Sequence, residues 1–332
     1  MILVEPCLSK QGSMTSLYRG SSSMVQTDAS LQPRFLVVDG HAYAYRAFYA
    51  IRHLNSPSGK ATNAIYGFIK MLAKMQAQLQ PSHVMIVWDG GLAQERMTLL
   101  PEYKAQRPEM PSDLEQQLDD IVEYLRAANI TSWCEEGVEA DDFIATIAKR
   151  SVDAGLPVVI ASADKDFMQL VSAQVSLLNP NDKTESLWTA ANVRGKSGVE
   201  PGQIVDWLSL VGDSVDNISG VAGVGPKTAS ELLNQFGSVE ELYRRLPEIK
   251  SERLRTNLEA ARELVLRNQK LIRLRDDLPC GIELKEFAAK PVAHEDLRQL
   301  FTAWGFKTLL HELDRNQVRQ SELFGDEKEM FS

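Results

Sequence analysis

The chain has 332 residues, with 36 Lys and Arg against 45 Asp and Glu, so its formal net charge is −9. Its length is sufficient for two domains and a sizeable core, and its three distant cysteines argue against a disulfide framework or a zinc ribbon. No apolar run reaches the roughly 18 residues that a membrane span needs, and the acidic balance argues against a nucleic-acid-binding protein of the simple basic kind.

The first 33 residues contain seven serines and show no apolar periodicity. Low periodicity with high polarity predicts a disordered tail over residues 1–33. A start codon assigned too early would explain the same segment, with Met14 and Met24 as later starts. Glu5 interrupts the short apolar start and disfavours a secretory signal, while organellar targeting by this tail stays open. We therefore expect a cytoplasmic protein.

Three short apolar runs predict buried strands: Phe35–Val38, Val84–Trp88 and Pro157–Ala161. Two amphipathic helical patterns lie between them, Ala61–Leu79 and Asp113–Ala128. Continuous apolar runs of this length are typical of strands that are covered on both faces of a parallel sheet. The alternation of strands and helices predicts an α/β fold over residues 34–199, with a mostly parallel central sheet flanked by helices.

After about residue 200 the strand pattern stops, and helical segments follow: Pro201–Val211, Pro226–Phe236, Val239–Arg245 and Ser251–Leu274. They predict a smaller all-helical domain over residues 200–292. Residues 242–275 carry ten basic residues against four acids, which fits either a duplex-facing surface or a solvated helix face. A C-terminal helix is expected over 293–315, on either domain, and a flexible tail over 316–332.

Three predicted strands are followed by aspartates, Asp39, Asp89 and Asp164. Ligands of open α/β sheets bind beyond the carboxyl ends of the strands. If the strands are neighbours, these three carboxylates point into one crevice. One such aspartate is explained by a turn or a helix cap, but three together favour a site.

Six further acids lie in short motifs: Glu139, Asp141, Asp142, Asp166, Asp213 and Asp216. Acids are ordinary at helix N-termini, but close clusters repel each other unless cations bind. Mg²⁺ and Mn²⁺ prefer carboxylate oxygens, and the five histidines lack zinc spacing. A carboxylate site for two such cations is typical of phosphodiester hydrolysis. Without these nine acids, 45 − 9 = 36 acids balance 36 bases, so the net charge no longer argues against DNA.

The segment 92–111 contains three prolines and is predicted to be a long loop. Loops of this length inside a compact domain are usually functional or disordered. Its basic residues Arg96, Lys104 and Arg107 are balanced by three glutamates. A solvated loop whose basic side chains face water therefore stays open on the residues by themselves.

The glycine-rich segment Gly220–Thr228 nearly fits a nucleotide-binding P-loop. Pro226 separates Gly225 from Lys227, and no strand precedes the segment, which argues against that reading. Gly223 and Gly225 would let the backbone approach a phosphate, and Pro226 suits the first helical position. The helix N-terminus and Lys227 would then hold a phosphate without reading sequence. The pattern predicts a DNA-binding hairpin between two helices, with a plain loop as the alternative.

Four motifs in order carry a resemblance to a known family: 36–41, 139–142, 163–166 and 212–217. On these residues the chain resembles the 5′ nucleases, the flap-endonuclease superfamily, and looks closest to the 5′→3′ exonuclease domain of bacterial DNA polymerase I. The resemblance covers residues 35–313 and implies a resolvase- or PIN-like nuclease core. No polymerase pattern follows, so we expect a stand-alone, monomeric nuclease associated with the bacterial nucleoid.

The resemblance implies two bound divalent cations, Mg²⁺ or Mn²⁺. It assigns the first to Asp39, Asp89, Glu139 and Asp141. It assigns the second to Asp164, Asp166 and Asp216, with Asp141 shared. Asp142 and Asp213 match acids of the same metal site that lie behind the direct ligands.

The resemblance also implies how DNA is held. Segment 92–111 matches the helical arch of the family, in which Arg96, Lys104 and Arg107 would act on the scissile phosphate. Tyr45 would stack on a base, since stacking suits single-stranded ends. Further expected DNA-binding residues are Arg46, Tyr103, Gly223, Gly225, Lys227 and Thr228. The glycine-rich segment matches the helix–three-turn–helix element, which implies a K⁺ ion at its turn.

The expected function is that of a structure-specific 5′→3′ exonuclease and 5′-flap endonuclease in replication and repair. Its partners would be DNA with 5′ flaps, nicks or 5′ ends, and RNA primers paired with DNA. One alternative is a DNA-binding module without catalysis. A haloacid-dehalogenase-like phosphatase would need a second acid in Asp39-Gly40-His41, and a small metal-dependent ribonuclease would lack the glycine-rich hairpin.

Gln320-Ser321-Glu322-Leu323-Phe324 resembles the Gln-x-x-Leu-Phe peptides that dock bacterial replication proteins on the sliding clamp. Two apolar anchors, Leu323 and Phe324, on a flexible tether would fit a groove, with Gln320 as the polar end of the motif. Motifs this short also arise by chance, so both readings stay open.

Overall fold

The computed structural model describes residues 34–315 except 183, 185 and 282, and these residues belong to one compact unit. The tails predicted over 1–33 and 316–332, and the motif at Gln320–Phe324 with them, lie outside the described residues. Within the described part, no helix is long and apolar enough to cross a membrane.

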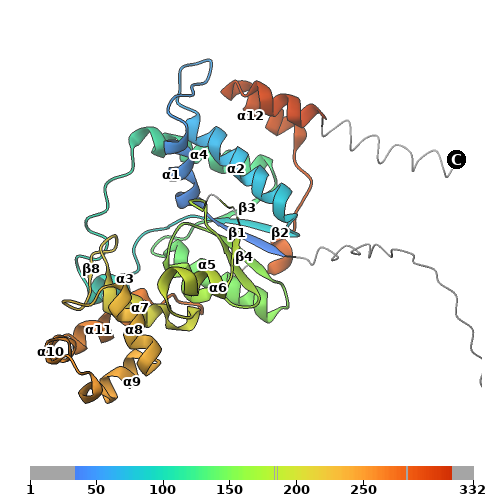
Figure 1. Cartoon of the computed structure of the whole chain (residues 1–332). Helices are drawn as coiled ribbons and strands as arrows, with labels where there is room; N and C mark the ends of the chain where they lie inside the picture. Colours follow the sequence, from blue (N-terminus) through green and yellow to red (C-terminus); the bar gives the residue numbers. More distant parts are fainter. Residues whose placement is uncertain (1–33, 183, 185, 282, 316–332) are drawn as a thin grey trace, which may run out of the picture. The chain divides into compact units, whose positions relative to one another are not determined.

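A six-stranded sheet forms the centre of the molecule (Figure 1). Its strands are β1 (Phe35–Asp39), β2 (His83–Val87), β3 (Thr131–Trp133), β4 (Val158–Ala161), β5 (Val175–Leu178) and β6 (Leu187–Trp188). They lie in the order β3-β2-β1-β4-β5-β6, and only β6 is antiparallel within this sheet. The mostly parallel sheet is confirmed. Since β1 lies between β2 and β4, the three strands that lead to the predicted aspartates are neighbours.

Helices cover both faces of the sheet. One face carries α1 (Gly40–Ala50), α2 (Asn63–Leu79), α4 (Ser112–Ala127) and α12 (His294–Trp304). The other face carries α5 (Ala140–Asp153) and α6 (Ala190–Ser197). Because side chains alternate along a strand, Leu36 and Val38 pack on the first face while Phe35 and Val37 pack on the second.

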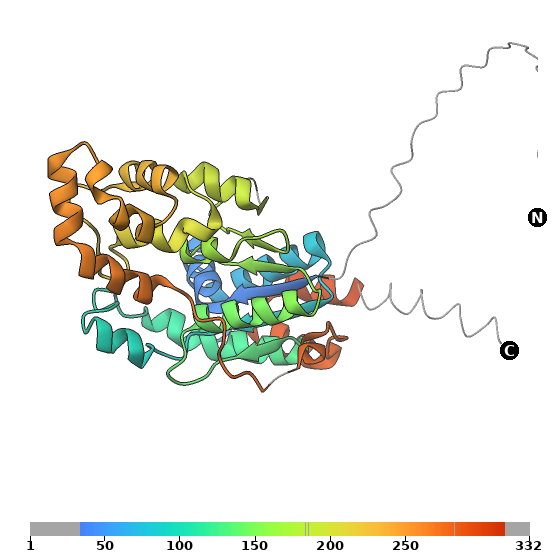
Figure 2. The same ribbon diagram turned by 90° about the horizontal axis from the view of Figure 1, so that it is seen from below.

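The helical region follows the sheet in sequence and lies at the end where β1 finishes (Figure 2). It contains η2 (Pro201–Gln203), α7 (Ile204–Val211), the ribbon of β7 (Gly212–Asp213) and β8 (Ile218–Ser219), α8 (Pro226–Phe236), α9 (Val239–Arg244), η3 (Leu246–Glu248), α10 (Glu252–Ala260) and α11 (Arg262–Ile272). Its buried side chains continue the core on the α5 face. The helical region is therefore packed on the sheet domain rather than tethered to it.

Two predicted helices were wrong as single elements. Ser251–Leu274 is divided at Ala261 into α10 and α11, and no glycine or proline marks that break. The predicted helix over 293–315 is interrupted: its first part, α12, ends before Gly305, whose φ of 75° is left-handed, and a second helical segment covers 307–315. α12 and the segment 307–315 both pack on the sheet face that carries α4.

The segment before residue 292, the predicted end of the helical domain, contacts the sheet. The 3₁₀ turn η4 (Leu284–Phe287) lies against the start of the sheet, where the rings of Phe287 and Phe35 stack at 5.3 Å. Ala288 forms an isolated bridge with His83. These contacts place the segment with the α/β part.

Candidate active site

The carboxyl ends of three neighbouring strands hold the first group of acids. Asp39 ends β1, and its Oδ1 accepts the N–H of Ala42 at 3.0 Å, so it caps α1. Asp89 follows β2, and its Oδ1 accepts the N–H of Ala140 at 3.2 Å, at the start of α5. Asp164 follows β4. These contacts direct the three carboxylates toward one pocket, as the strand ends predict.

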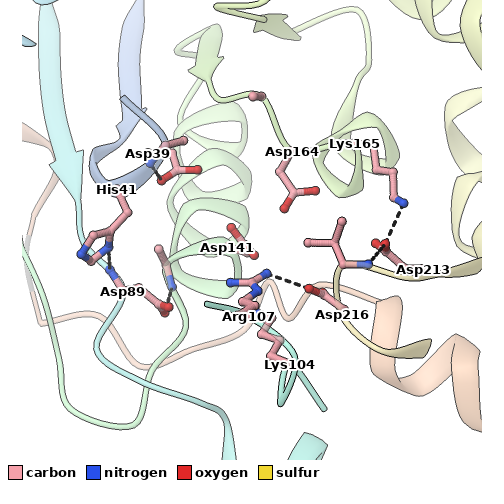
Figure 3. Close-up of a pocket in the computed structure, with 14 residues that line it drawn as sticks. Asp39, His41, Asp89, Lys104, Arg107, Asp141, Asp164, Lys165, Asp213 and Asp216 are labelled. Carbon is pink, nitrogen blue, oxygen red and sulfur yellow. Dashed lines mark hydrogen bonds and ion pairs between the residues drawn. The ribbon is translucent and has the colours of Figure 1, made fainter. Parts of the chain in front are cut away.

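The pocket has a volume of about 390 Å³. Six carboxylates line it: Asp39, Asp89, Asp141, Asp164, Asp213 and Asp216. The basic side chains in its wall are Lys104, Arg107 and Lys165, together with His41. Figure 3 shows these side chains around a common space, contributed by the sheet edge, α5, segment 92–111 and the loop after β7.

A second group of acids stands at one side of the pocket. Asp166, at the start of η1 (Asp166–Leu170), and Asp213 and Asp216 each offer one carboxylate oxygen within 4.8 Å of the others. The Oδ1 atom of Asp166 is buried and has no hydrogen-bond partner among the described residues. An unpartnered buried carboxylate oxygen beside two others fits a hard divalent cation, which binds oxygen ligands. Asp213 therefore lies among the candidate ligands rather than behind them.

The pKa values of these acids show that their charges are not balanced by the protein. Burial, with the charges of Asp164 and Asp89, raises the pKa of Asp39 to about 6. Burial and the charge of Asp164 raise the pKa of Asp141 and of Asp166 well above the usual range. Burial, with the charges of Asp216 and Asp213, raises the pKa of Asp164 as well. Such a cluster is stabilised when cations or protons supply the missing positive charge.

Segment 92–111 brings basic groups to the pocket. It contains a short helix, α3 (Gln94–Leu99), followed by turns. Lys104 has a left-handed φ of 57°, which costs a non-glycine residue about 1 kcal/mol, and its N–H donates to the carbonyl of Asp216 at 3.1 Å. The Arg107 guanidinium reaches Asp216 Oδ1 at 2.7 Å. Lys104 and Arg107 are thus held at the pocket.

Arg96 and Asp142, which the resemblance assigned to the phosphate and to the metal site, do not line the pocket. Arg96 is 5% exposed and Asp142 is 2% exposed. The guanidinium nitrogens Nη1 and Nη2 of Arg96 donate to the two carboxylate oxygens of Asp142, each at 2.7 Å. This buried two-pronged pair leaves Arg96 unavailable to a phosphate and Asp142 unavailable to a metal ion.

Glu139 and Tyr103 also have partners within the protein. Glu139 Oε2 lies 2.5 Å from the Lys104 ammonium and accepts the Tyr103 hydroxyl at 3.2 Å, and its Oε1 accepts the N–H of Ala93 at 3.0 Å. Burial would raise the pKa of Glu139, but the charges of Lys104 and Arg96 outweigh it and lower that pKa. Tyr103 is 3% exposed, so little of its ring is accessible.

The predicted DNA-binding residues of α1 lie on its accessible side. The ring of half-buried Tyr45 stacks on exposed Tyr49, with centroids 6.5 Å apart. Arg46 is exposed, and its Nη1 donates to Asn181 Oδ1 at 2.6 Å. Both follow closely on Asp39, which caps the same helix.

The glycine-rich hairpin ends at the start of α8. Gly223 has a left-handed φ of 79°, and Gly225 is the N-cap residue of α8 without a side-chain cap. The Lys227 side chain is 90% exposed, with its ammonium 3.9 Å from Glu231, and Thr228 is half-buried. The first N–H groups of this helix thus lack a capping side chain, which suits an anionic ligand.

Comparison with known proteins gives family matches to both the sheet part and the helical part of the chain. The family descriptions "5'-3' exonuclease, N-terminal resolvase-like domain" and "5'-3' exonuclease, C-terminal SAM fold" match residues 34–198 and 199–295. A 5'-3' exonuclease of Aquifex aeolicus is 37% identical over 87% of this chain and 98% of its own length. The chain belongs to the 5′–3′ exonuclease family.

Other relatives of this exonuclease-family chain are larger or more distant. DNA polymerase I of Bacillus caldotenax is 38% identical over 86% of the chain, which spans 33% of that polymerase. A solved T5 5′-exonuclease structure with bound divalent metal ions (zinc) has a TM-score of 0.61 at 23% identity, covering 86% of this chain and 98% of its own. The catalytic core of Rad2 with DNA substrate has a TM-score of 0.55 at 16% identity, covering 83% and 89%. The two solved structures share the fold.

Three residues of the exonuclease site were not predicted. Ser162 Oγ donates to Asp39 Oδ2 at 2.8 Å and accepts the N–H of Asp164 at 3.1 Å, so it spaces two carboxylates. His41 Nδ1 accepts the N–H of Asp89 at 3.2 Å. The Lys165 ammonium lies 2.9 Å from Asp213 Oδ1. All three stand within two residues of a predicted acid, and that proximity was the available signal.

Proposed function

We propose that this protein cleaves phosphodiester bonds near the 5′ ends and 5′ flaps of DNA and of RNA primers paired with DNA. The observation that carries the proposal is the pocket lined by six carboxylates, with basic side chains in the same wall. The family match supports a nuclease, and the unbalanced charge of the pocket supports cation-dependent hydrolysis.

The residues present fit two divalent cations. Asp39, Asp89 and Asp141 would hold one, and Asp166, Asp213 and Asp216 would hold the other, with Asp164 between the two groups. When bound, Mg²⁺ or Mn²⁺ would activate a water molecule and neutralise charge on the phosphate. The T5 exonuclease structure with divalent ions supports this assignment by its shared fold.

The basic residues of the pocket would bind the substrate phosphate. Arg107 is held by Asp216 through one guanidinium nitrogen, and its side chain is 39% exposed, so further donors remain for a phosphate oxygen. Lys104 lines the pocket while its ammonium contacts Glu139. Their positive charge would stabilise the negative charge that develops on the phosphate.

The hairpin and the tail would supply the other contacts. The N-terminus of α8, with Gly223, Gly225 and Lys227, would hold a duplex phosphate, and a K⁺ ion at this turn belongs to the same proposal. We further propose that the motif at Gln320–Phe324 binds the sliding clamp. The protein would be a monomer associated with the nucleoid. Residues 34–199 would form the nuclease core and the helical region the duplex-binding part.

The direct test is cleavage of a 5′-flap duplex labelled at its 5′ end, with product length as the readout. Wild type should cleave with Mg²⁺ and not with EDTA. Asp141→Asn should lose at least about 100-fold in rate, because it removes a pocket carboxylate. The matched control is Asp153→Asn, an exposed residue at the other end of α5, which should cleave as wild type does. Cleavage in EDTA, or none with either Mg²⁺ or Mn²⁺, would contradict the proposal.

A further inference from the structure

A buried ion pair outside the pocket joins three segments of the chain. Arg96 belongs to α3 in segment 92–111, and Asp142 belongs to the first turn of α5. The third segment is the end of α11, the last helix of the helical region, with the residues directly after it. Neither charged side chain lines the pocket, so the pair needs another explanation than contact with substrate.

The guanidinium group of Arg96, which carries five N–H groups, donates four hydrogen bonds and makes one further ion-pair contact. Nη1 and Nη2 donate to Asp142 at 2.7 Å, and Nη1 also lies 3.4 Å from Glu139 Oε1. Nε donates to the carbonyl of Leu271 at 2.9 Å, and Nη2 to that of Arg273 at 3.2 Å. Lysine could not reproduce this planar arrangement of donors.

Asp142 also binds the chain that follows α11. Its Oδ1 also accepts the N–H of Arg275 at 2.9 Å, and its carbonyl accepts the Thr146 hydroxyl at 3.0 Å. That hydroxyl oxygen in turn accepts the N–H of Leu278 at 3.2 Å. The chain that leaves α11 is therefore bound to the helix that carries Asp141.

The contacts continue to the duplex-binding hairpin. Asn268 on α11 is completely buried, and its side-chain amide donates to the carbonyls of Ser209 and Ser219 at 3.1 and 2.8 Å. Ser219 ends β8, directly before the glycine-rich segment. A continuous path of contacts thus runs from the hairpin through α11 and Arg96 to the first turn of α5.

We propose that Arg96 and Asp142 are positioning residues that fix the spacing between the hairpin and the catalytic carboxylates, and thereby select the phosphodiester that is cut. The inference rests on the proposed function. Buried ion pairs are poor sources of stability, since apolar replacements of similar volume are often tolerated. A pair that bonds to three segments at once is suited to fixing geometry.

The decisive variant is the double substitution Arg96→Met/Asp142→Leu, which removes both buried charges together. Arg96→Lys keeps the charge and loses the planar group of donors. The control is Arg150→Met: Arg150 also joins α5 to the segment after α11, through the carbonyl of Cys280 at 3.0 Å, but from the far end of the helix. For each protein we would measure thermal unfolding, flap-duplex binding in Ca²⁺, and the rate and position of cleavage in Mg²⁺.

We expect both Arg96 variants to bind the flap duplex as wild type does, to cleave about 100-fold more slowly, and to spread their products over neighbouring phosphodiesters. The control should keep the single wild-type product even where its unfolding temperature falls. A folded Arg96 variant with the wild-type rate and product position would overturn the inference. If the double variant fails to fold, Arg96→Lys decides by the same readouts. Failure of wild type to cleave at all would instead contradict the proposed function.

Discussion

The acids that line the pocket and the two acids outside it, Glu139 and Asp142, look alike in the sequence. In the structure they differ in how many basic or hydrogen-bond-donating partners they have. Asp141 and Asp142 are neighbours on α5, yet one lines the pocket with a strongly raised pKa and the other is bonded on both oxygens to Arg96. Glu139 resembles Asp142, because Lys104 and Tyr103 satisfy it. The supply of donors from other segments therefore separates a candidate metal ligand from a structural carboxylate.

The largest expected effect concerns Asp166, whose Oδ1 atom is buried and has no hydrogen-bond partner within the described part of the chain. Asp166→Asn should lower cleavage by at least about 100-fold, because it weakens a candidate cation site. The same substitution should raise the unfolding temperature of the metal-free protein, since it removes one of several repelling charges. Flap cleavage and thermal unfolding in EDTA check the two halves. A metal-free variant that is less stable than wild type would contradict the unbalanced charge.

The second prediction concerns the satisfied acids, where the sign of the stability change is reversed. Glu139→Gln removes the closest counter-charge of the buried Lys104 ammonium, so the free energy of unfolding should fall by about 3 kcal/mol. Urea unfolding in EDTA measures it. The control is Glu312→Gln, which breaks the half-exposed pair with Lys70 and should cost less than about 1 kcal/mol. Equal losses in the two variants would remove the distinction between buried and exposed pairs.

Stabilisation by added metal should distinguish the acids that line the pocket from the pair of Arg96 and Asp142 outside it, without an assay of cleavage. Mg²⁺ at about 100 times its Kd should raise the free energy of unfolding of wild type by about 2.7 kcal/mol. Asp166→Asn should lose most of this stabilisation, whereas Arg96→Lys should keep it, because Arg96 lies outside the pocket. Thermal unfolding across a Mg²⁺ titration is the measurement. An equal loss of Mg²⁺ stabilisation in both variants would show that the Arg96–Asp142 pair is part of the metal site.

The sequence predicts the elements whose signal is local. β1, β2 and β4 each contain an unbroken run of four buried apolar residues, because both faces of the sheet are covered. By contrast, β3 has three half-buried residues and β5 is interrupted by Ser176, so neither produces a clear run. The strand-end aspartates follow from the same pattern. The roles of Glu139 and Asp142 could not be predicted, because their partners Lys104 and Arg96 are 35 and 46 residues away in the chain.

The smallest expected effect concerns the hairpin, where the basic side chain is solvated rather than buried. Lys227→Ala removes a 90% exposed ammonium at the start of α8. If it contacts one phosphate, the slope of log affinity against log salt should fall by about 0.9, with the same loss of affinity for every duplex sequence. Fluorescence anisotropy in Ca²⁺ at several salt concentrations measures this slope. Lys196→Ala, an exposed lysine on α6, is the control. A sequence-dependent loss would indicate base contacts, and an unchanged slope would mean that Lys227, unlike Lys104 and Arg107, is only a solvated charge.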